Sequence, residues 1–289
     1  MATVIFDGIA SGMLLFLISV GLSVTLGLMG FVNLAHGAFA MLGGYVCVLL
    51  LNRAGIPFLA TLPLVAVSVG LVGAVLERTL YRRLYGATHL DQVLFSIGLM
   101  LMAIGAAHYG FGDRQQPLAL PPYLQGQFNL PGVDLGVYRL FLVITGLLIA
   151  AGLEVLVWRT RFGARLRAAV DNPTAARGLG IDVQRVYVLA FALGSALAGL
   201  GGALGVEILG LDPGFPVKTI VYFLIVVAVG GSGSIKGSLL AALILGVADV
   251  AGKYYVPQVG AFVIYAVMVG MLIVRPEGLV GLFGRRVAH

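Results

Sequence analysis

The chain has 289 residues, of which 60% are hydrophobic and 10% are charged, and its mean hydropathy is +1.05. Soluble domains carry about 25% charged residues, so this composition excludes a soluble globular protein and predicts an integral membrane protein. The net charge of +6 does not indicate nucleic-acid binding, because the arginines lie in loops between apolar segments. These segments are continuous runs of membrane-spanning length, which predict an all-α bundle and not a β-barrel.

The first two predicted spans, residues 4–29 and 31–51, have almost no polar loop between them. The sequence of residues 27–37 is Gly-Leu-Met-Gly-Phe-Val-Asn-Leu-Ala-His-Gly. Backbone at membrane depth is left unwound only where protein or a cavity satisfies its polar groups. We therefore predict a tight connection or a broken helix that faces the bundle interior. The candidate substrate-path residues in it are Gly30, Asn33, His36 and Gly37.

The next three predicted spans are residues 57–76, 92–111 and 138–158. The basic loop 78–90 separates the first two, and Asp91 is placed to cap the second. Between the second and third, residues 112–137 contain four prolines and little charge, so they predict a long loop outside the membrane.

The polar, basic stretch 159–182 follows the fifth span, and its second half has the signals of a short helix. Asn172 suits an N-cap, and Pro173 fits the first helical position, where no N–H is needed. Asp171 places a negative charge at the helix N-terminus, and Gly180 can adopt the left-handed conformation that ends a helix. These signals predict a helix of about two turns, which is too short to be stable alone in water.

The predicted short helix has one small apolar face, formed by Ala175, Ala176 and Leu179. A short helix with such a face, held between two membrane spans, is suited to dock into a groove on a partner. On this interpretation, Ala176→Arg overfills the docking face. The alternative is an ordinary basic cytoplasmic loop.

The second half of the chain contains one long predicted span and one broken element. Asp182 is placed to cap the span 183–206, in which small residues recur every fourth position and favour close helix packing. Residues 207–218 predict a loop, and residues 219–229 are apolar but shorter than a full span. They run into a glycine-rich segment that predicts a broken or re-entrant helix, with the glycines Gly230, Gly231, Gly233 and Gly237. Two more spans, 238–252 and 259–274, bring the bundle to about eight or nine transmembrane helices.

Lysine and arginine are distributed unequally between the two sides of the predicted bundle. The loop 78–90, the stretch 159–186, Lys236 and the tail after residue 274 hold most of the 18 basic residues. The other side holds only Arg53, Arg114, Arg139, Lys218 and Lys253. Because cytoplasmic loops are enriched in Lys and Arg, we expect the C-terminus and the stretch 159–182 in the cytoplasm and the loop 112–137 outside.

The sequence contains no catalytic or metal-binding constellation. The four histidines and the single cysteine, Cys47, do not have metal-ligand spacing. The glycine-rich run ends in Lys236-Gly237, where a Walker A phosphate loop needs Lys followed by Ser or Thr. We therefore expect a protein that is not an enzyme and that binds no metal or cofactor itself.

Ionisable residues inside a membrane are costly and are functional candidates for that reason. Few are present here. Glu154 lies one turn from the end of its span, and Asp249 and Lys253 can pair four residues apart on one helix face. For His36, the alternative to a path residue is a neutral ring bonded to a neighbouring carbonyl.

Four stretches together resemble the LivH-type permease of bacterial branched-chain amino-acid ABC importers. They are Gly-Leu-Met-Gly-Phe-Val-Asn-Leu-Ala-His-Gly-Ala-Phe-Ala-Met-Leu-Gly-Gly-Tyr (27–45), Arg-Ala-Ala-Val-Asp-Asn-Pro-Thr-Ala-Ala-Arg-Gly-Leu-Gly-Ile (167–181), Gly-Gly-Ser-Gly-Ser-Ile-Lys-Gly (230–237) and Arg-Pro-Glu-Gly-Leu (275–279). Lys236 and Glu277 depart from the family pattern, which often has Pro and Gln there.

The resemblance implies that residues 1–289 form a single transmembrane permease domain in the bacterial inner membrane, surrounded by lipid. Its partners would be a second, LivM-like permease, two cytoplasmic ABC ATPase subunits that bind ATP and Mg, and a periplasmic substrate-binding protein. The short helix around Asp171–Gly180 would be the coupling helix that seats in an ATPase groove. Transport would proceed by alternating access, with branched-chain or related small amino acids as substrates.

Three other functions are open at this point. Similar permeases carry urea, short amides or other small carboxylates. A stand-alone secondary transporter or facilitator would need no partner, although the chain lacks a series of intramembrane acids for ion coupling. A membrane-embedded enzyme is disfavoured because His, Asp and Glu do not cluster.

Overall fold

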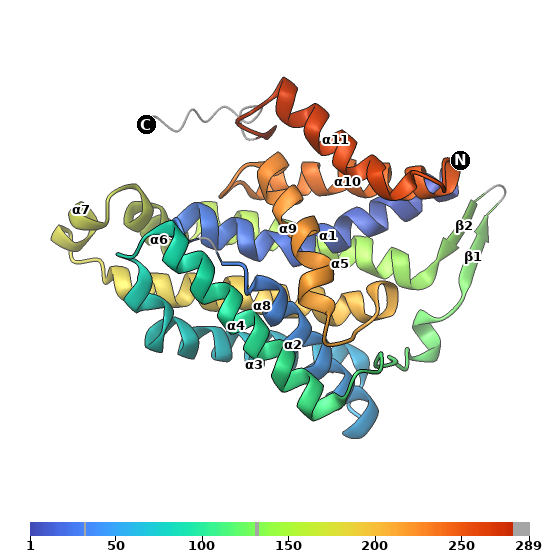
Figure 1. The fold of residues 1–289 in the computed structure, drawn as a ribbon, viewed down its shortest axis with the longest axis horizontal. Helices are drawn as coiled ribbons and strands as arrows, with labels where there is room; N and C mark the ends of the chain where they lie inside the picture. The colour runs from blue at the N-terminus through green and yellow to red at the C-terminus, as the bar shows by residue number, and fades with distance from the viewer. Residues whose placement is uncertain (32, 131–132, 280–289) are drawn as a thin grey trace.

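The long apolar helix α1 (Ala2–Met29) forms the centre of the computed structural model, which describes residues 1–31, 33–130 and 133–279. Between Ala10 and Thr25 almost every side chain of α1 is buried. A helix that is apolar on all sides is stable only where other helices surround it. Helices α5, α8, α9 and α10 pack around α1 in this way (Figure 1).

The other elements follow one another as an up-and-down bundle. They are α2 (His36–Val48) with a π-helical extension (Leu49–Arg53), α3 (Phe58–Thr79), α4 (His89–Phe111), β1 (Gln127–Leu130), β2 (Val133–Gly136), α5 (Val137–Arg159), α6 (Arg161–Asp171), α7 (Pro173–Gly178), α8 (Val183–Leu209), α9 (Phe215–Gly230), α10 (Ile235–Tyr255) and α11 (Gly260–Val274). Short 3-10 turns occupy Tyr81–Leu84 and Pro122–Leu124, and β1 and β2 form an antiparallel hairpin.

Six of these helices are long and apolar enough to cross a membrane: α1, α3, α4, α5, α8 and α10. Helices α9 and α11 are apolar but shorter, with 16 and 15 residues. The structure therefore confirms the predicted all-α polytopic bundle. It also confirms a break within 230–237, where residues 231–234 join α9 to α10. Gly231 and Gly233 lie in the break, whereas Gly230 is the last residue of α9 and Gly237 lies in the first turn of α10.

The bundle has two distinct ends (Figure 1). One, called the hairpin end below, carries the N-terminus, β1, β2 and the α8–α9 connection. This connection is bonded to the segment after α4, because the Gln116 N–H donates to the Leu211 carbonyl at 2.8 Å. The other, called the α7 end, carries α6, α7 and the α3–α4 connection. Tyr85 and Tyr187 meet there edge to face, with ring centroids 5.6 Å apart. The two basic segments 78–90 and 159–186 therefore lie at the same end.

Small residues allow the helices of the core to touch through their backbones. A methyl group added at Gly246 of α10 would overlap the backbone of Gly12 in α1. On α8, a methyl group at Gly202 would overlap the carbonyl of Ala40 in α2, and one at Gly194 would lie 2.9 Å from the carbonyl oxygen of Gly21. The predicted small-residue face of α8 is buried and makes these contacts.

Four local predictions need correction. Thr88, not Asp91, is the N-cap of α4. Asp91 is the third residue of the helix and completes the capping box, because its carboxylate accepts from Thr88. The loop expected at 207–218 is shorter, because α8 continues to Leu209 and α9 begins at Phe215 with Pro216 in its first turn. The second hydrophobic segment becomes helical only at His36. Part of the loop 112–137 forms the β1–β2 hairpin.

The backbone contact at Gly202 can be tested with one methyl group. We expect Gly202→Ala to lower stability by about 1–3 kcal/mol, because α2 and α8 must separate to accommodate the new Cβ. Gly98→Ala on α4 is the control, since nothing lies near its added Cβ. The thermal unfolding midpoint of each purified variant in detergent measures the difference, and equal midpoints would contradict the packing account.

Candidate functional site

The connection between α1 and α2 is held by a buried polar node. The side-chain oxygen of Asn33 accepts from the Tyr81 hydroxyl at 2.9 Å and from the Ala35 N–H at 3.1 Å. The Leu34 N–H donates to the Ser96 hydroxyl at 3.1 Å. Burial raises the pKa of Tyr81 above its ordinary value, so its hydroxyl remains a donor. Asn33 therefore joins the connection to the α3–α4 region and satisfies backbone that is not helical.

The other three predicted path residues occupy different environments. His36 is buried, and its Nε2 lies 2.8 Å from the Ile18 carbonyl oxygen of α1, as the alternative interpretation expected. Gly37 lies against α9, where an added Cβ would be 3.0 Å from the Cα of Pro216. Gly30 is exposed and ends α1 in the left-handed conformation, with φ 62°.

Asn33, His36 and Gly37 therefore lie where α1, α2, α9 and the α3–α4 connection meet. Asn33 and His36 both use polar atoms in bonds within the bundle. Tyr81 and Ser96 were missed by sequence reasoning, because Tyr81 lies in a basic loop 48 residues from Asn33 and no local signal links them. Whether a substrate passes this junction stays a prediction.

The break between α9 and α10 lies directly against the end of α1. Gly231 and Gly233 adopt φ of 86° and 79°, which side chains with a Cβ rarely adopt. The Gly233 N–H donates to the Ser23 carbonyl at 3.0 Å, and the hydroxyls of Ser23 and Ser238 lie 2.9 Å apart. The two glycine-rich segments, 27–37 and 230–237, are thus neighbours in space.

An ion pair connects this break to α5. Lys236, in the first turn of α10, lies 3.0 Å from the Glu154 carboxylate on α5. Glu154, near the end of its span, is therefore paired. Lys236, which departs from the family pattern, has Glu154 as its ion-pair partner. Asp249 and Lys253 also pair, at 2.7 Å, as predicted from their spacing.

Helices α6 and α7 form one unit at the α7 end. The sequence did not reveal α6, which begins at the N-cap Thr160 and turns Leu166 and Ala169 inward. These side chains form a small apolar cluster with Ala176 of α7 and with the first turns of α8, at Val183, Val186 and Ala190. Arg167 of α6 lies over Trp158 of α5, with its guanidinium carbon 4.5 Å from the ring centre.

Helix α7 is capped at both ends as predicted. The Asn172 side chain accepts from the Ala175 N–H at 2.9 Å, and Pro173 occupies the first helical position. At the other end Gly180 has φ 79°, and its N–H donates to Arg177 O while the Ile181 N–H donates to Ala176 O. This is the Schellman arrangement that ends a helix. Asp171 is the last residue of α6 and not part of α7.

The predicted apolar face of α7 is only partly free. Ala176 is 2% exposed because it packs into the chain's own cluster, so the expectation that it faces a partner is wrong. Ala176→Arg would disrupt the α6–α8 packing and is not a clean test of docking. Leu179 is 81% exposed, and Ala175 is exposed beside it. Leu179, the C-cap residue of α7, therefore presents a large apolar side chain on the surface.

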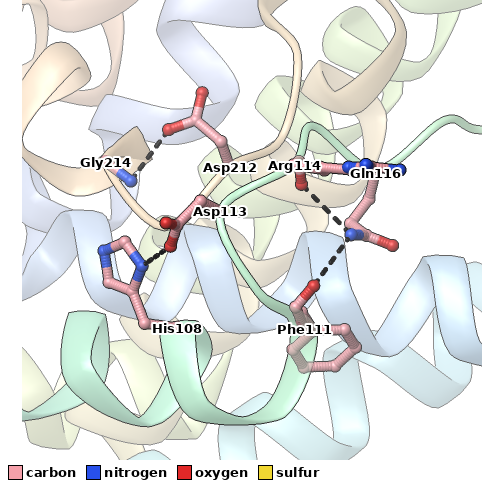
Figure 2. Close-up of polar contacts among 7 residues, drawn as sticks. All are labelled: His108, Phe111, Asp113, Arg114, Gln116, Asp212 and Gly214. Carbon is pink, nitrogen blue, oxygen red and sulfur yellow. Dashed lines mark hydrogen bonds and ion pairs between the residues drawn. The ribbon is translucent and has the colours of Figure 1, made fainter.

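The hairpin end carries a second set of polar contacts, some within the segment 108–116 at the end of α4 and one within the α8–α9 connection (Figure 2). The Gln116 side chain donates to the carbonyls of Phe111 and Arg114, and His108 pairs with Asp113. Asp212 accepts from the Gly214 N–H at 2.8 Å and also pairs with Lys218. These contacts hold the two loops in their observed conformations.

Nothing in the described ranges forms a group of three His, Cys, Asp or Glu side chains that could hold a metal ion. The described residues form a buried helix junction around Asn33 and His36, and the α6–α7 unit lies at one end of the bundle. Its chemistry is that of helix packing and hydrogen bonding.

The cap of α7 gives a direct prediction. Asn172→Ala leaves the Ala175 N–H without its acceptor and is expected to destabilise the short helix by about 0.5–2 kcal/mol. Asn172→Asp keeps an acceptor and serves as the control. Hydrogen exchange of the peptide covering 170–182 should be faster in the Ala variant only, and unchanged exchange would show that the cap contributes nothing.

Residues 4–272 match the family model described as branched-chain amino acid transport system / permease component. The Pseudomonas aeruginosa high-affinity branched-chain amino acid transport system permease protein BraD is 27% identical, over 95% of this chain and 94% of its own. The Escherichia coli protein LivH, of the same description, is 27% identical over 96% and 94%. The autoinducer 2 import system permease protein LsrC of Klebsiella pneumoniae is 31% identical over 51% and 42%. No solved structure matches.

Proposed function

The chain belongs to the branched-chain amino-acid transport permease family, and from this premise we propose its role in an importer. It is the membrane-spanning subunit through which branched-chain or related small amino acids enter the cytoplasm. ATP hydrolysis, with ATP and Mg bound by two partner ATPase subunits, supplies the energy. A periplasmic binding protein delivers the substrate.

The observation that carries this proposal is the architecture of the α6–α7 unit. A six-residue helix has too few hydrogen bonds to persist alone, yet this one is capped at both ends and packed on α8. Such fixation is useful where a helix must transmit force. Its exposed Leu179 is then the apolar contact that an ATPase groove covers.

The orientation of the proposed importer follows from charge. The basic segments 78–90 and 159–186 lie at the α7 end, and excess Lys and Arg is typical of cytoplasmic loops. We propose that the α7 end and the C-terminus lie on the cytoplasmic side of a bacterial inner membrane. The hairpin end, with the Asp212 loop and the segment around Gln116, then receives the binding protein.

The second permease is proposed to cover the outward face of α9. Val217, Val221 and Leu224 are 53%, 41% and 37% exposed, and Ala228 continues the same face. Their spacing of four, three and four residues forms one stripe on the helix. The opposite face of α9 packs on α1, α2 and α10, and this supports our proposal that the conduit lies between the two permeases.

A coupled movement can pass from α7 to this conduit. Helix α7 rests on α8, and α5 is tied to the first turn of α10 by the Glu154–Lys236 pair. The α9–α10 break touches the last turns of α1, just before the α1–α2 connection, so tilting these helices would open or close the junction around Asn33 and His36. This is the alternating-access mechanism that we propose.

The substrate is proposed at the level of a class. BraD and LivH are described as branched-chain amino acid permeases, whereas LsrC, which matches half of the chain, is described as an autoinducer 2 permease. One scaffold therefore serves different solutes. Urea, short amides and other small carboxylates form the alternative class, and the binding protein would make most of the selection.

The docking role of α7 can be tested in cells that carry the whole transporter. Leu179→Glu is expected to reduce ATP-dependent uptake of labelled leucine, isoleucine or valine more than tenfold, because an apolar contact becomes a desolvated charge. Leu90→Glu is the control, since Leu90 is 66% exposed at the same end but outside α6 and α7. Both variants should reach the membrane in normal amounts. Normal uptake by Leu179→Glu would exclude the docking role.

A further inference from the structure

A cavity of about 310 Å³ separates α4 from α2 and α3. Its walls are apolar and include Ala38 and Met41 of α2, Val72 and Leu76 of α3, and Leu99 and Ala103 of α4. The α4 side of the cavity runs from Leu99 to Phe111, a rise of about 18 Å at 1.5 Å per residue. The cavity therefore extends along about half of α4.

One polar atom of the cavity lining has no partner. Tyr45 is 3% exposed, and its hydroxyl makes no hydrogen bond in the described part of the chain. The ring stacks on Phe111, the last residue of α4, with centroids 4.0 Å apart. Leaving a buried hydroxyl unbonded costs free energy, so this group is suited to a ligand with an acceptor at the hairpin end of the cavity.

The rim of the cavity belongs to the membrane-facing surface. Val72 is 39% exposed and Ala106 is also exposed, and both lie well inside helices that are long enough to cross a membrane. Beside them, Leu71 and Met102 are 62% and 70% exposed. The opening is thus continuous with surface that lipid hydrocarbon covers, and a zwitterionic amino acid would find no charged partner inside.

We propose that this cavity holds one acyl chain of a membrane phospholipid. The chain lies along α4, and the Tyr45 hydroxyl donates to the ester oxygen at its head. The length, the apolar walls and the single donor near the membrane surface all fit this ligand. The proposal concerns α2, α3 and α4 and does not depend on which solute the protein transports.

Photocrosslinking of the full chain in nanodiscs tests this assignment. The discs contain phosphatidylethanolamine and phosphatidylglycerol with a trace of phosphatidylcholine that carries a diazirine on one acyl chain. Ala38 and Met41 are 8% and 3% exposed, so bulk lipid does not reach them. We expect crosslinks on the α2 peptide that contains them, as well as on the outward faces of α3 and α4.

Two variants on α4 separate the cavity from the surface. Ala103→Trp fills the cavity and is expected to lower α2 crosslinking about fivefold or more, because a close-packed ring excludes the chain. Met102→Trp adds the same ring to the lipid-facing side of α4 and should leave the α2 crosslinking unchanged. Both must elute as folded protein on size exclusion. Crosslinks confined to α3 and α4, or α2 crosslinks that persist in Ala103→Trp, would overturn the proposal.

The hydroxyl has its own test, which does not change the shape of the cavity. Tyr45→Phe keeps the ring on Phe111 and removes the donor. We expect α2 crosslinking to fall about two- to tenfold, the effect of one hydrogen bond. An unchanged yield would show that no lipid ester is bound there.

Discussion

The backbone contacts of α1 with α8 and α10 constrain the rest of the structure. At Gly12 against Gly246, and at Gly21 against Gly194, the helices approach so closely that no added side chain fits. Lipid gives helices little hydrophobic reason to associate, so close van der Waals packing at small residues must hold them. This packing sets the position of the C-terminal end of α1 in the bundle. The α1–α2 connection starts from this end, and the α9–α10 break packs against it.

Local rules predicted much of this fold from the sequence. The apolar runs identified most of the spans, and the caps Asn172 and Asp182 and the stop at Gly180 were confirmed, because each depends on residues only a few positions apart. Helix α6 was missed because its arginines resemble a loop. Its apolar side, at Leu166 and Ala169, becomes meaningful only when α8 covers it.

The candidate site was predictable in position but not in its interactions. Asn33 and His36 are polar residues between two apolar runs, and this position predicted that they face the bundle interior. Their partners, the Tyr81 hydroxyl and the Ile18 carbonyl, are set by how separate helices pack, which sequence spacing does not encode. For the same reason, the pattern of α7 could not show that Ala176 faces inward while Leu179 faces out. The family membership supplies the transport role, and the structure shows that α7 is capped at both ends and packed on α8.

The accessibility of Leu179 in the native membrane tests the proposed coupling most directly. Cys47 is buried, so Leu179→Cys adds one reactive thiol to a chain with no other exposed cysteine in the described ranges. A maleimide reagent is applied to native membranes before and after a urea wash that strips peripheral subunits. The account predicts slow labelling before the wash and fast labelling after it, because an ATPase covers α7. Equally fast labelling in both samples would contradict it.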